Sequence, residues 1–206
     1  MSAEAVSART RRRQELVRIA GELFATRGVE NTTVRDIGEA AGILSGSLYH
    51  HFDSKESIIE ELLAPFQSEL WLKYEAILAS GAGTRDKVRA VIEASFRAIE
   101  DHHTEVAVFQ NDAAYLMGLP GFAFLRTNNE RFHDMWIELI EDGIATGDLR
   151  PDVDPELAFR FIRDTLWVAV RWYRPEGDTP IDEIAEQYIE IVLHGIQDEG
   201  DDRRSA

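Results

Sequence analysis

The 206-residue chain contains no cysteine. Disulfide bonds, thiolate metal ligands and cysteine nucleophiles are therefore excluded. It also has no run of 18 apolar residues, so we expect no transmembrane helix and no membrane partner. Its first 13 residues are polar and then basic, and they lack the apolar stretch of a secretion signal. We therefore expect a cytoplasmic protein. Hydrophobic residues make up 44% of the chain, which is enough for a sizeable core.

Positive charge is scarce, with 22 Lys and Arg against 38 Asp and Glu. Residues 1–60 carry a net charge of only −1, whereas the rest of the chain carries −15. The densest basic run is Arg11, Arg12 and Arg13. This distribution predicts a DNA-contacting N-terminal end and an acidic body that opposes non-specific binding to nucleic acid. Taken alone, the arginine run is more typical of a solvated helix start.

Apolar residues recur at helical spacing along almost the whole chain, and alternating strand patterns are absent. We therefore predict an all-α fold with about nine helices. The first helix buries a face from Leu16 to Phe24 and stops at Gly28. The polar tail 198–206 is expected to be frayed. Later helices, separated by glycine- and proline-containing breaks, are expected at 84–101, 104–117, 122–146, 155–173 and 180–197.

The segment after the first helix has the pattern of a helix-turn-helix. Thr33, followed three residues later by Asp36, resembles a capping box and opens a short helix that ends at Gly42. A four-residue turn leads to a third short helix with Leu48 and Phe52 on its inner side. Three helices in about 45 residues, joined by a glycine-containing turn, define this DNA-binding motif.

A second capping-box pattern, Asp53 with Glu56, predicts a long fourth helix through about Ser80.

The outer side of the third helix is expected to face DNA. Small residues there let the backbone approach the groove, and serine, tyrosine and histidine side chains bond phosphates or base edges. One of the two adjacent histidines, His50 and His51, is expected to face DNA while the other packs. No metal site is expected, because adjacent residues rarely share a metal. With backbone-phosphate contacts added, the predicted DNA-binding residues are Thr33, Arg35, Ser45, Gly46, Ser47, Tyr49, His50 and Lys55.

The stretch from Thr32 to Lys55 resembles the signature of the TetR family. The resemblance implies a helix-turn-helix DNA-binding domain in residues 1–53 and a helical ligand-binding and dimerisation domain in residues 54–206. One departure is that the family usually has Ser-Lys where this chain has Leu44-Ser45. A phosphate-contacting lysine is therefore missing, and we expect Ser45 to cap the third helix one residue later than usual.

The last two long helices are amphipathic. In TetR-type proteins this pair packs against the same pair of a second copy as a four-helix bundle, so a homodimer is expected. An alternative is that both apolar stripes serve only the intramolecular core. The first stripe comprises Leu157, Phe161, Thr165, Val168 and Trp172, and the second comprises Ile181, Ile184, Tyr188, Ile191, Val192 and Ile196.

The predicted helix 155–173 places Arg163, Trp167 and Arg171 at spacings of four residues, on one face. Two interpretations stay open. The arginines pair with acidic side chains across a dimer, or they bind an anionic ligand, because guanidinium groups bind phosphate and indole rings stack. An acyl-CoA thioester offers phosphates, an adenine ring and an apolar acyl part, and is the expected ligand of these three residues.

Residues 42–52 and 160–175 are similar to actinobacterial TetR repressors of cholesterol catabolism, which control breakdown of the steroid C and D rings. The resemblance implies a repressor that binds a palindromic operator as a dimer and is released by a CoA thioester of a steroid-ring fragment. Alternatives are a TetR-type sensor of a neutral drug or fatty acid, or an enzyme that uses acyl-CoA. No nucleophile–base pair is evident, so we expect no enzyme and no cofactor.

Overall fold

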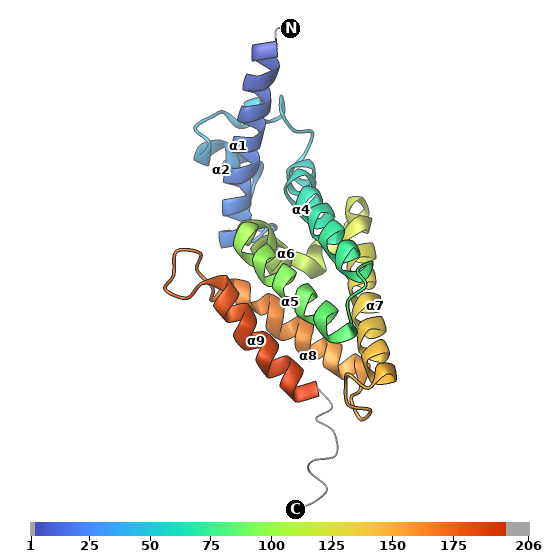
Figure 1. Cartoon of the computed structure of the whole chain (residues 1–206). Helices are drawn as coiled ribbons and strands as arrows, with labels where there is room; N and C mark the ends of the chain where they lie inside the picture. Colours follow the sequence, from blue (N-terminus) through green and yellow to red (C-terminus); the bar gives the residue numbers. More distant parts are fainter. Residues whose placement is uncertain (1–2, 197–206) are drawn as a thin grey trace, which may run out of the picture. The chain divides into compact units, whose positions relative to one another are not determined.

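The computed structural model describes residues 3–196, and their side chains from residue 8 onward. Over this range the chain forms nine α-helices and two 3-10 helices and contains no strand, which confirms the all-α prediction (Figure 1). The predicted tail 198–206 lies outside the described residues. The elements are α1 (Ala3–Arg27), α2 (Val34–Ala40), α3 (Ser45–Leu48), α4 (Lys55–Leu78), α5 (Thr84–Asp101), α6 (His103–Gly118), η1 (Pro120–Phe122), α7 (Ala123–Thr146), α8 (Pro155–Trp167), η2 (Val168–Arg171) and α9 (Ile181–Ile196).

The chain packs as two compact units. Unit 1 comprises Met1–Glu69 and His102–Leu125, and unit 2 comprises Leu70–Asp101 and Arg126–Ala206. Helix α6 thus belongs by packing to the unit that holds the helix-turn-helix. The predicted domain boundary between residues 53 and 54 separates DNA binding from ligand binding and not two packing units. This boundary stays a prediction.

The core of unit 1 forms around the apolar face of α1. Leu16 and Phe24 on this face are fully buried, as the sequence predicted, together with Ile37 from α2. Burial of each such side chain contributes about 1.5–3 kcal/mol. Helix α6 closes the other side, where the Val29 amide donates to the Asp112 carboxylate at 3.1 Å.

The predicted cap of α2 is confirmed. The Asp36 amide donates to the Thr33 hydroxyl at 3.2 Å, and the Thr33 amide donates to the Asp36 carboxylate at 2.7 Å. The Thr33 hydroxyl also donates to the Asp36 carboxylate, and this bond, followed by the bond from the Thr33 amide, lowers the pKa of Asp36. After α2 the chain turns at Gly42, whose φ of +66° is left-handed.

Two predicted helix starts are wrong by one residue. The fourth helix is capped by Ser54 and Ser57 rather than by Asp53 and Glu56. The Ser57 amide donates to the Ser54 hydroxyl at 3.2 Å, and the Ser54 amide donates to the Ser57 hydroxyl at 3.3 Å.

The third helix also starts differently from the prediction, because Ser45 is its first residue and not its cap. Leu44 holds the capping position and makes no side-chain hydrogen bond to the helix.

In unit 2, α5 packs against α8 and α9. Ion pairs join Arg89 of α5 to Glu186 at 2.6 Å and to Glu190 at 3.3 Å. The Tyr188 hydroxyl ties α9 to α8, because it donates to the Ile162 carbonyl at 2.9 Å and lies 2.8 Å from the Thr165 hydroxyl. Burial raises the pKa of Tyr188 to about 12. The facing surfaces of these helices are thus fixed by polar as well as apolar contacts.

The prediction of a continuous α-helix over 155–173 is wrong in its last part. The α-helix ends at Trp167, and residues 168–171 form a 3-10 helix. The other predicted long helices agree with the structure to within a few residues. The helix predicted at 122–146 begins at Ala123, because residue 122 belongs to the short 3-10 helix η1.

Replacing Gly42 with alanine tests the turn between α2 and α3. We expect Gly42→Ala to lower the free energy of unfolding by about 1 kcal/mol, because a Cβ disfavours the left-handed conformation. Gly46→Ala is the matched control, since Gly46 lies in α3 with open space around its Cβ position. Urea denaturation measures both variants. Equal stability of the Gly42 variant and the wild type would contradict the requirement for glycine at this turn.

Candidate DNA-reading surface and ligand-binding face

The outer surface of α3 is small and polar, with one aromatic side chain at its end. Leu48 is buried and anchors the helix, whereas Gly46, Tyr49 and His50 are exposed. Tyr49 has 58% of its surface exposed. No heavy atom outside the helix lies within 4 Å of a Cβ built on Gly46. This surface is therefore open to solvent. Ser45 and Ser47 are half-buried at its edges.

The two histidines after α3 have different surroundings. His50 is exposed, and its carbonyl accepts a bond from Arg9 at 3.5 Å. His51 is half-buried beside Phe52, and its Nδ1 is buried without a hydrogen-bond partner. Burial, and then the charge of Arg9 and other arginines, lower the pKa of His51. His51 therefore packs, and contact of His50 with DNA stays a prediction.

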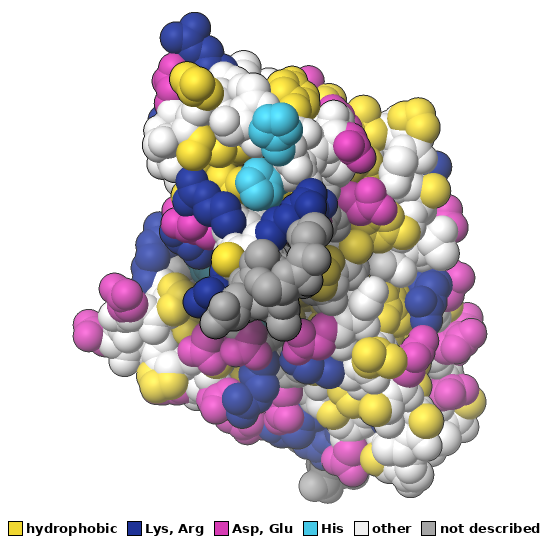
Figure 2. Space-filling model, turned by 90° about the horizontal axis from the view of Figure 1, so that it is seen from above, with side chains coloured by type: hydrophobic (Ala, Val, Ile, Leu, Met, Phe, Trp, Pro, Cys, Tyr) yellow, Lys and Arg dark blue, Asp and Glu magenta, His cyan; other side chains and the backbone are white. Residues whose placement is uncertain are grey.

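Two residues of the arginine run brace unit 1 internally. Arg12 donates to the Ala41 carbonyl at the end of α2, at 3.0 Å. Arg13 binds the Glu61 carboxylate at 2.6 Å and lies 4.2 Å from the centre of the Phe52 ring. Figure 2 shows lysine and arginine side chains gathered beside histidine on the drawn face. Arg12 and Arg13 thus hold helices of unit 1 together, and the run is more than a solvated helix start.

The predicted phosphate contacts from around α2 also have partners within the chain. Thr33 is used in the α2 cap, and Arg35 is exposed with its guanidinium 2.8 Å from the Glu39 carboxylate. The Lys55 ammonium donates to the Val29 carbonyl at 2.7 Å and to the Thr32 carbonyl at 3.2 Å. Lys55 thus fixes the loop between α1 and α2, and its contact with phosphate stays a prediction.

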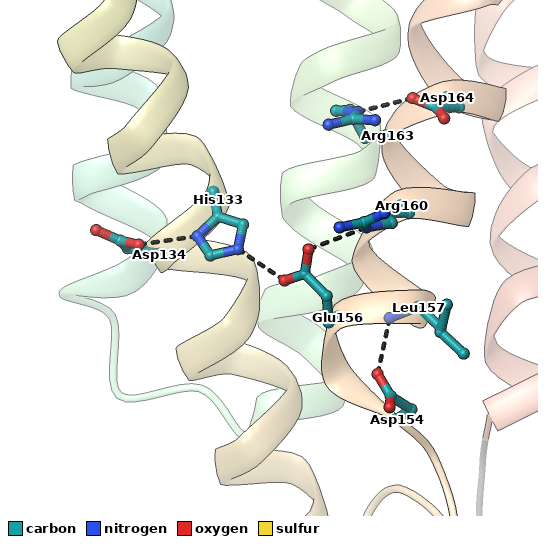
Figure 3. A network of polar contacts seen from close by, with 8 residues as sticks. All are labelled: His133, Asp134, Asp154, Glu156, Leu157, Arg160, Arg163 and Asp164. Atoms are coloured by element: carbon teal, nitrogen blue, oxygen red, sulfur yellow. Dashed lines mark hydrogen bonds and ion pairs between the residues drawn. The ribbon is translucent and has the colours of Figure 1, made fainter.

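Of the three predicted ligand-binding residues, α8 holds Arg163 and Trp167 one turn apart. The Arg163 guanidinium lies 5.3 Å from the centre of the Phe159 ring and binds Asp164 at 2.7 Å (Figure 3). The half-buried Trp167 ring lies 6.2 Å from the Phe132 ring. Arg171 is exposed in η2, where three residues per turn move it off the line of the other two. Of the three residues predicted on one face, Arg163 and Trp167 therefore share it, and Arg171 does not.

A polar network next to this face was not predicted. The His133 ring, on α7, lies 2.9 Å from the Asp134 carboxylate and 2.8 Å from the Glu156 carboxylate, which also binds Arg160 at 3.0 Å (Figure 3). Hydrogen bonds to Asp134 and then Glu156 raise the pKa of His133. This network ties α7 to the first turn of α8. No sequence motif marks a pair 23 residues apart.

The first predicted stripe lies on the outer surface of unit 2, with Leu157 and Phe161 on α8, Val168 in η2 and Trp172 just after η2. Leu157, Phe161, Val168 and Trp172 are all exposed, Phe161 by 70%. The interpretation that this stripe serves only the internal core is therefore wrong. The core is built instead by the opposite face of α8, from Phe159, Ile162 and Leu166.

The predicted α9 stripe is divided between core and surface. Ile181 is buried, Ile184, Tyr188, Val192 and Ile196 are half-buried, and Ile191 is exposed by 73%. The outer part of α9 thus exposes Ile191 to solvent.

Family models match both parts of the chain. Residues 16–62 match the bacterial regulatory proteins of the tetR family, and residues 81–196 match the tetracyclin repressor-like C-terminal domain. The chain belongs to the TetR family. It is accordingly a transcriptional regulator and not an enzyme.

Among TetR-family relatives, the chain is similar to transcriptional repressors named KstR2. It is 49% identical to KstR2 of Rhodococcus jostii, over 94% of this chain and 95% of the relative. It is 47% identical to KstR2 of Mycobacterium tuberculosis, over 92% and 94%. The solved structure of that ketosteroid transcriptional regulator has a TM-score of 0.87, with 91% and 96% of the two chains covered at 46% identity.

A more distant TetR-type fold belongs to AibR, solved in complex with isovaleryl coenzyme A and operator DNA, with a TM-score of 0.76 at 20% identity, covering 88% of this chain and 98% of AibR. At this identity the likeness shows the fold alone. Within residues 3–196 of the present chain, no helix is long and apolar enough to cross a membrane. The side chains described there include no group of three histidine or acidic residues that could hold a metal.

Substitutions of Tyr49 and His50 test the reading surface. Each alanine variant should weaken operator binding by about 1–3 kcal/mol if the side chain contacts bases. Both should unfold like the wild type, because both side chains are exposed. Lys55→Met, by contrast, should also destabilise the fold by about 1–3 kcal/mol, because two carbonyls lose a charged donor. Fluorescence anisotropy with DNA and thermal unfolding separate the two effects. Unchanged binding in both alanine variants would remove α3 from the reading role.

Proposed function

We propose that this protein is a dimeric repressor of steroid-catabolism genes, released from a near-palindromic operator by a CoA thioester of a steroid-ring fragment. The proposal rests on sequence similarity: about half of the residues are identical to those of KstR2 repressors, along nearly the whole chain. One of these relatives is described as a ketosteroid transcriptional regulator. A bacterial regulator that reads chromosomal DNA acts in the cytoplasm.

The chemistry of α8 supports a CoA thioester as inducer. Arg163 pairs with the adjacent, exposed Asp164, and such surface pairs contribute little energy, so its guanidinium is available to a phosphate. Trp167, one turn on, offers an indole face on which an adenine ring stacks. Arg163 lies beside the Phe159 ring and Trp167 lies beside the Phe132 ring, and both of these rings are buried in the core of unit 2.

The exposed apolar side chains on α8 and on the segment that follows it support a two-fold dimer. Two copies that join these surfaces as a four-helix bundle bury Phe161 and Trp172, which are otherwise in water. A two-fold dimer in turn implies a near-palindromic operator with half-sites about one helical turn apart, or a multiple of it. Because Arg163 and Trp167 are on the same helix as the stripe, a ligand bound there can change the tilt between the two copies. The spacing of the two α3 helices then no longer fits the operator.

The dimer is tested by Phe161→Glu. At a two-fold interface the new carboxylate is buried close to the same carboxylate of the partner copy. The variant should therefore become monomeric at micromolar concentration and lose high-affinity operator binding. Its helix content should not change. Leu72→Glu is the matched control, because Leu72 is equally exposed on α4 at 67% and should stay dimeric. Sedimentation measures both variants. A monomeric wild-type protein would contradict the proposal.

The inducer is tested by operator release with a panel of CoA thioesters and the corresponding free acids. Arg163→Met and Trp167→Leu should bind DNA normally. Loss of a charge-assisted bond of about 1.5–3 kcal/mol should make the Arg163 variant need about ten- to a hundred-fold more thioester for release. Arg160→Met is the control, since Arg160 lies on the same helix but is not one of the proposed ligand contacts, and its partner Glu156 belongs to the network with His133. Release of the Arg163 and Trp167 variants at wild-type concentrations would place the ligand elsewhere.

A further inference from the structure

Leu44 is an apolar side chain displayed to solvent at the start of α3. With 81% of its surface exposed, it is the most exposed large apolar residue among those that the structure describes. Within the described part of unit 1, the other large apolar side chain that is exposed is Tyr49, at the opposite end of α3. The two side chains therefore frame the surface that is proposed to read DNA.

Stability of the fold does not explain a leucine here. Leu44 occupies the capping position of α3, where Ser, Thr, Asp and Asn satisfy a free backbone amide and leucine does not. Its side chain makes no such bond, and its exposure means that it contributes little hydrophobic burial. Leu44 thus adds neither a cap nor a core contact to unit 1.

The backbone nevertheless holds Leu44 in a defined place. The Leu44 carbonyl accepts the Ser47 amide at 2.8 Å, and the preceding Ile43 amide donates to the Gly38 carbonyl of α2 at 2.9 Å. A Cβ added to Gly38 would lie only 3.1 Å from the Ile43 carbonyl oxygen, so α2 and this turn are in close contact. The turn is anchored on both sides, and Leu44 projects from a fixed point.

We propose that Leu44 contacts the C5-methyl group of a thymine in each operator half-site and so specifies that base pair. The inference rests on the proposed function of α3 as the reading helix. Residues at the start of a recognition helix reach base edges in the major groove. The apolar group that the four base pairs present there is the thymine methyl, which aliphatic side chains recognise by contact. An isolated leucine beside small polar residues suits one methyl group better than the broad apolar patch of a protein partner.

The test uses an operator duplex selected from a random-sequence library with the full-length protein. Each thymine of the half-site is replaced in turn, symmetrically, by deoxyuridine, which removes only the methyl group. At one of these positions, the deoxyuridine substitution should lower the affinity of the wild-type protein about fourfold per half-site. This is the loss expected when one buried methyl-sized group is removed. Leu44→Ala should bind the thymine and deoxyuridine duplexes equally at that position, and should keep the wild-type response at every other position.

Leu44→Ser separates reading from folding. The serine restores a capping hydroxyl, so this variant should unfold at the same or a higher temperature than the wild type while losing the methyl dependence. A Leu44→Ala protein that keeps the full methyl dependence overturns the inference, and so does a wild type that responds to no deoxyuridine substitution. A Leu44→Ser protein that unfolds earlier and loses affinity for all duplexes alike would also overturn it. If the selection yields no specific duplex, the proposed function of α3 fails with it.

Discussion

The DNA-reading part of the molecule depends on the hydrophobic core that α1 provides. Helices of seven and four residues, such as α2 and α3, are too short to persist alone, because helix nucleation costs more than so few hydrogen bonds return. Ile37 and Leu48 are almost completely buried in the core that the α1 face forms. The geometry of the reading surface is therefore a property of unit 1 as a whole.

Cationic side chains in unit 1 reinforce that core. Arg12 binds the end of α2, Arg13 binds Glu61 of α4, and Lys55 binds the loop before α2. Because the chain has a net charge of −16, these internal contacts leave few lysine and arginine side chains that could bind DNA phosphates.

The sequence was sufficient to predict features that arise from neighbours along the chain. The α2 cap made by Thr33 and Asp36 follows from a three-residue spacing, and the end of α2 just before Gly42 follows from that glycine. The exposed stripe on α8 follows from helical periodicity and from the family resemblance. The prediction at the start of α4 failed because two cap patterns overlap, and the reciprocal bonds of Ser54 and Ser57 prevail.

Other features depend on residues that meet only in the folded chain. The change from α-helix to 3-10 helix after Trp167 has no marker such as glycine or proline in 168–171, so the alignment of Arg171 was misjudged. The contacts of His133 with Glu156 and of Lys55 with the Val29 carbonyl join segments far apart in sequence. Periodicity describes which side of a helix is buried, but it does not say which polar groups will face each other.

The separation within α3 between an inward anchor and an outward surface has an evolutionary consequence. Leu48 carries the contacts that hold the helix, whereas Gly46, Tyr49 and His50 face outward. Substitutions at such exposed positions usually change the free energy of unfolding by less than about 0.5 kcal/mol. After a gene duplication, one copy can therefore acquire a new target sequence through changes on this surface while its fold stays intact. Divergence of regulatory networks then requires no intermediate that fails to fold.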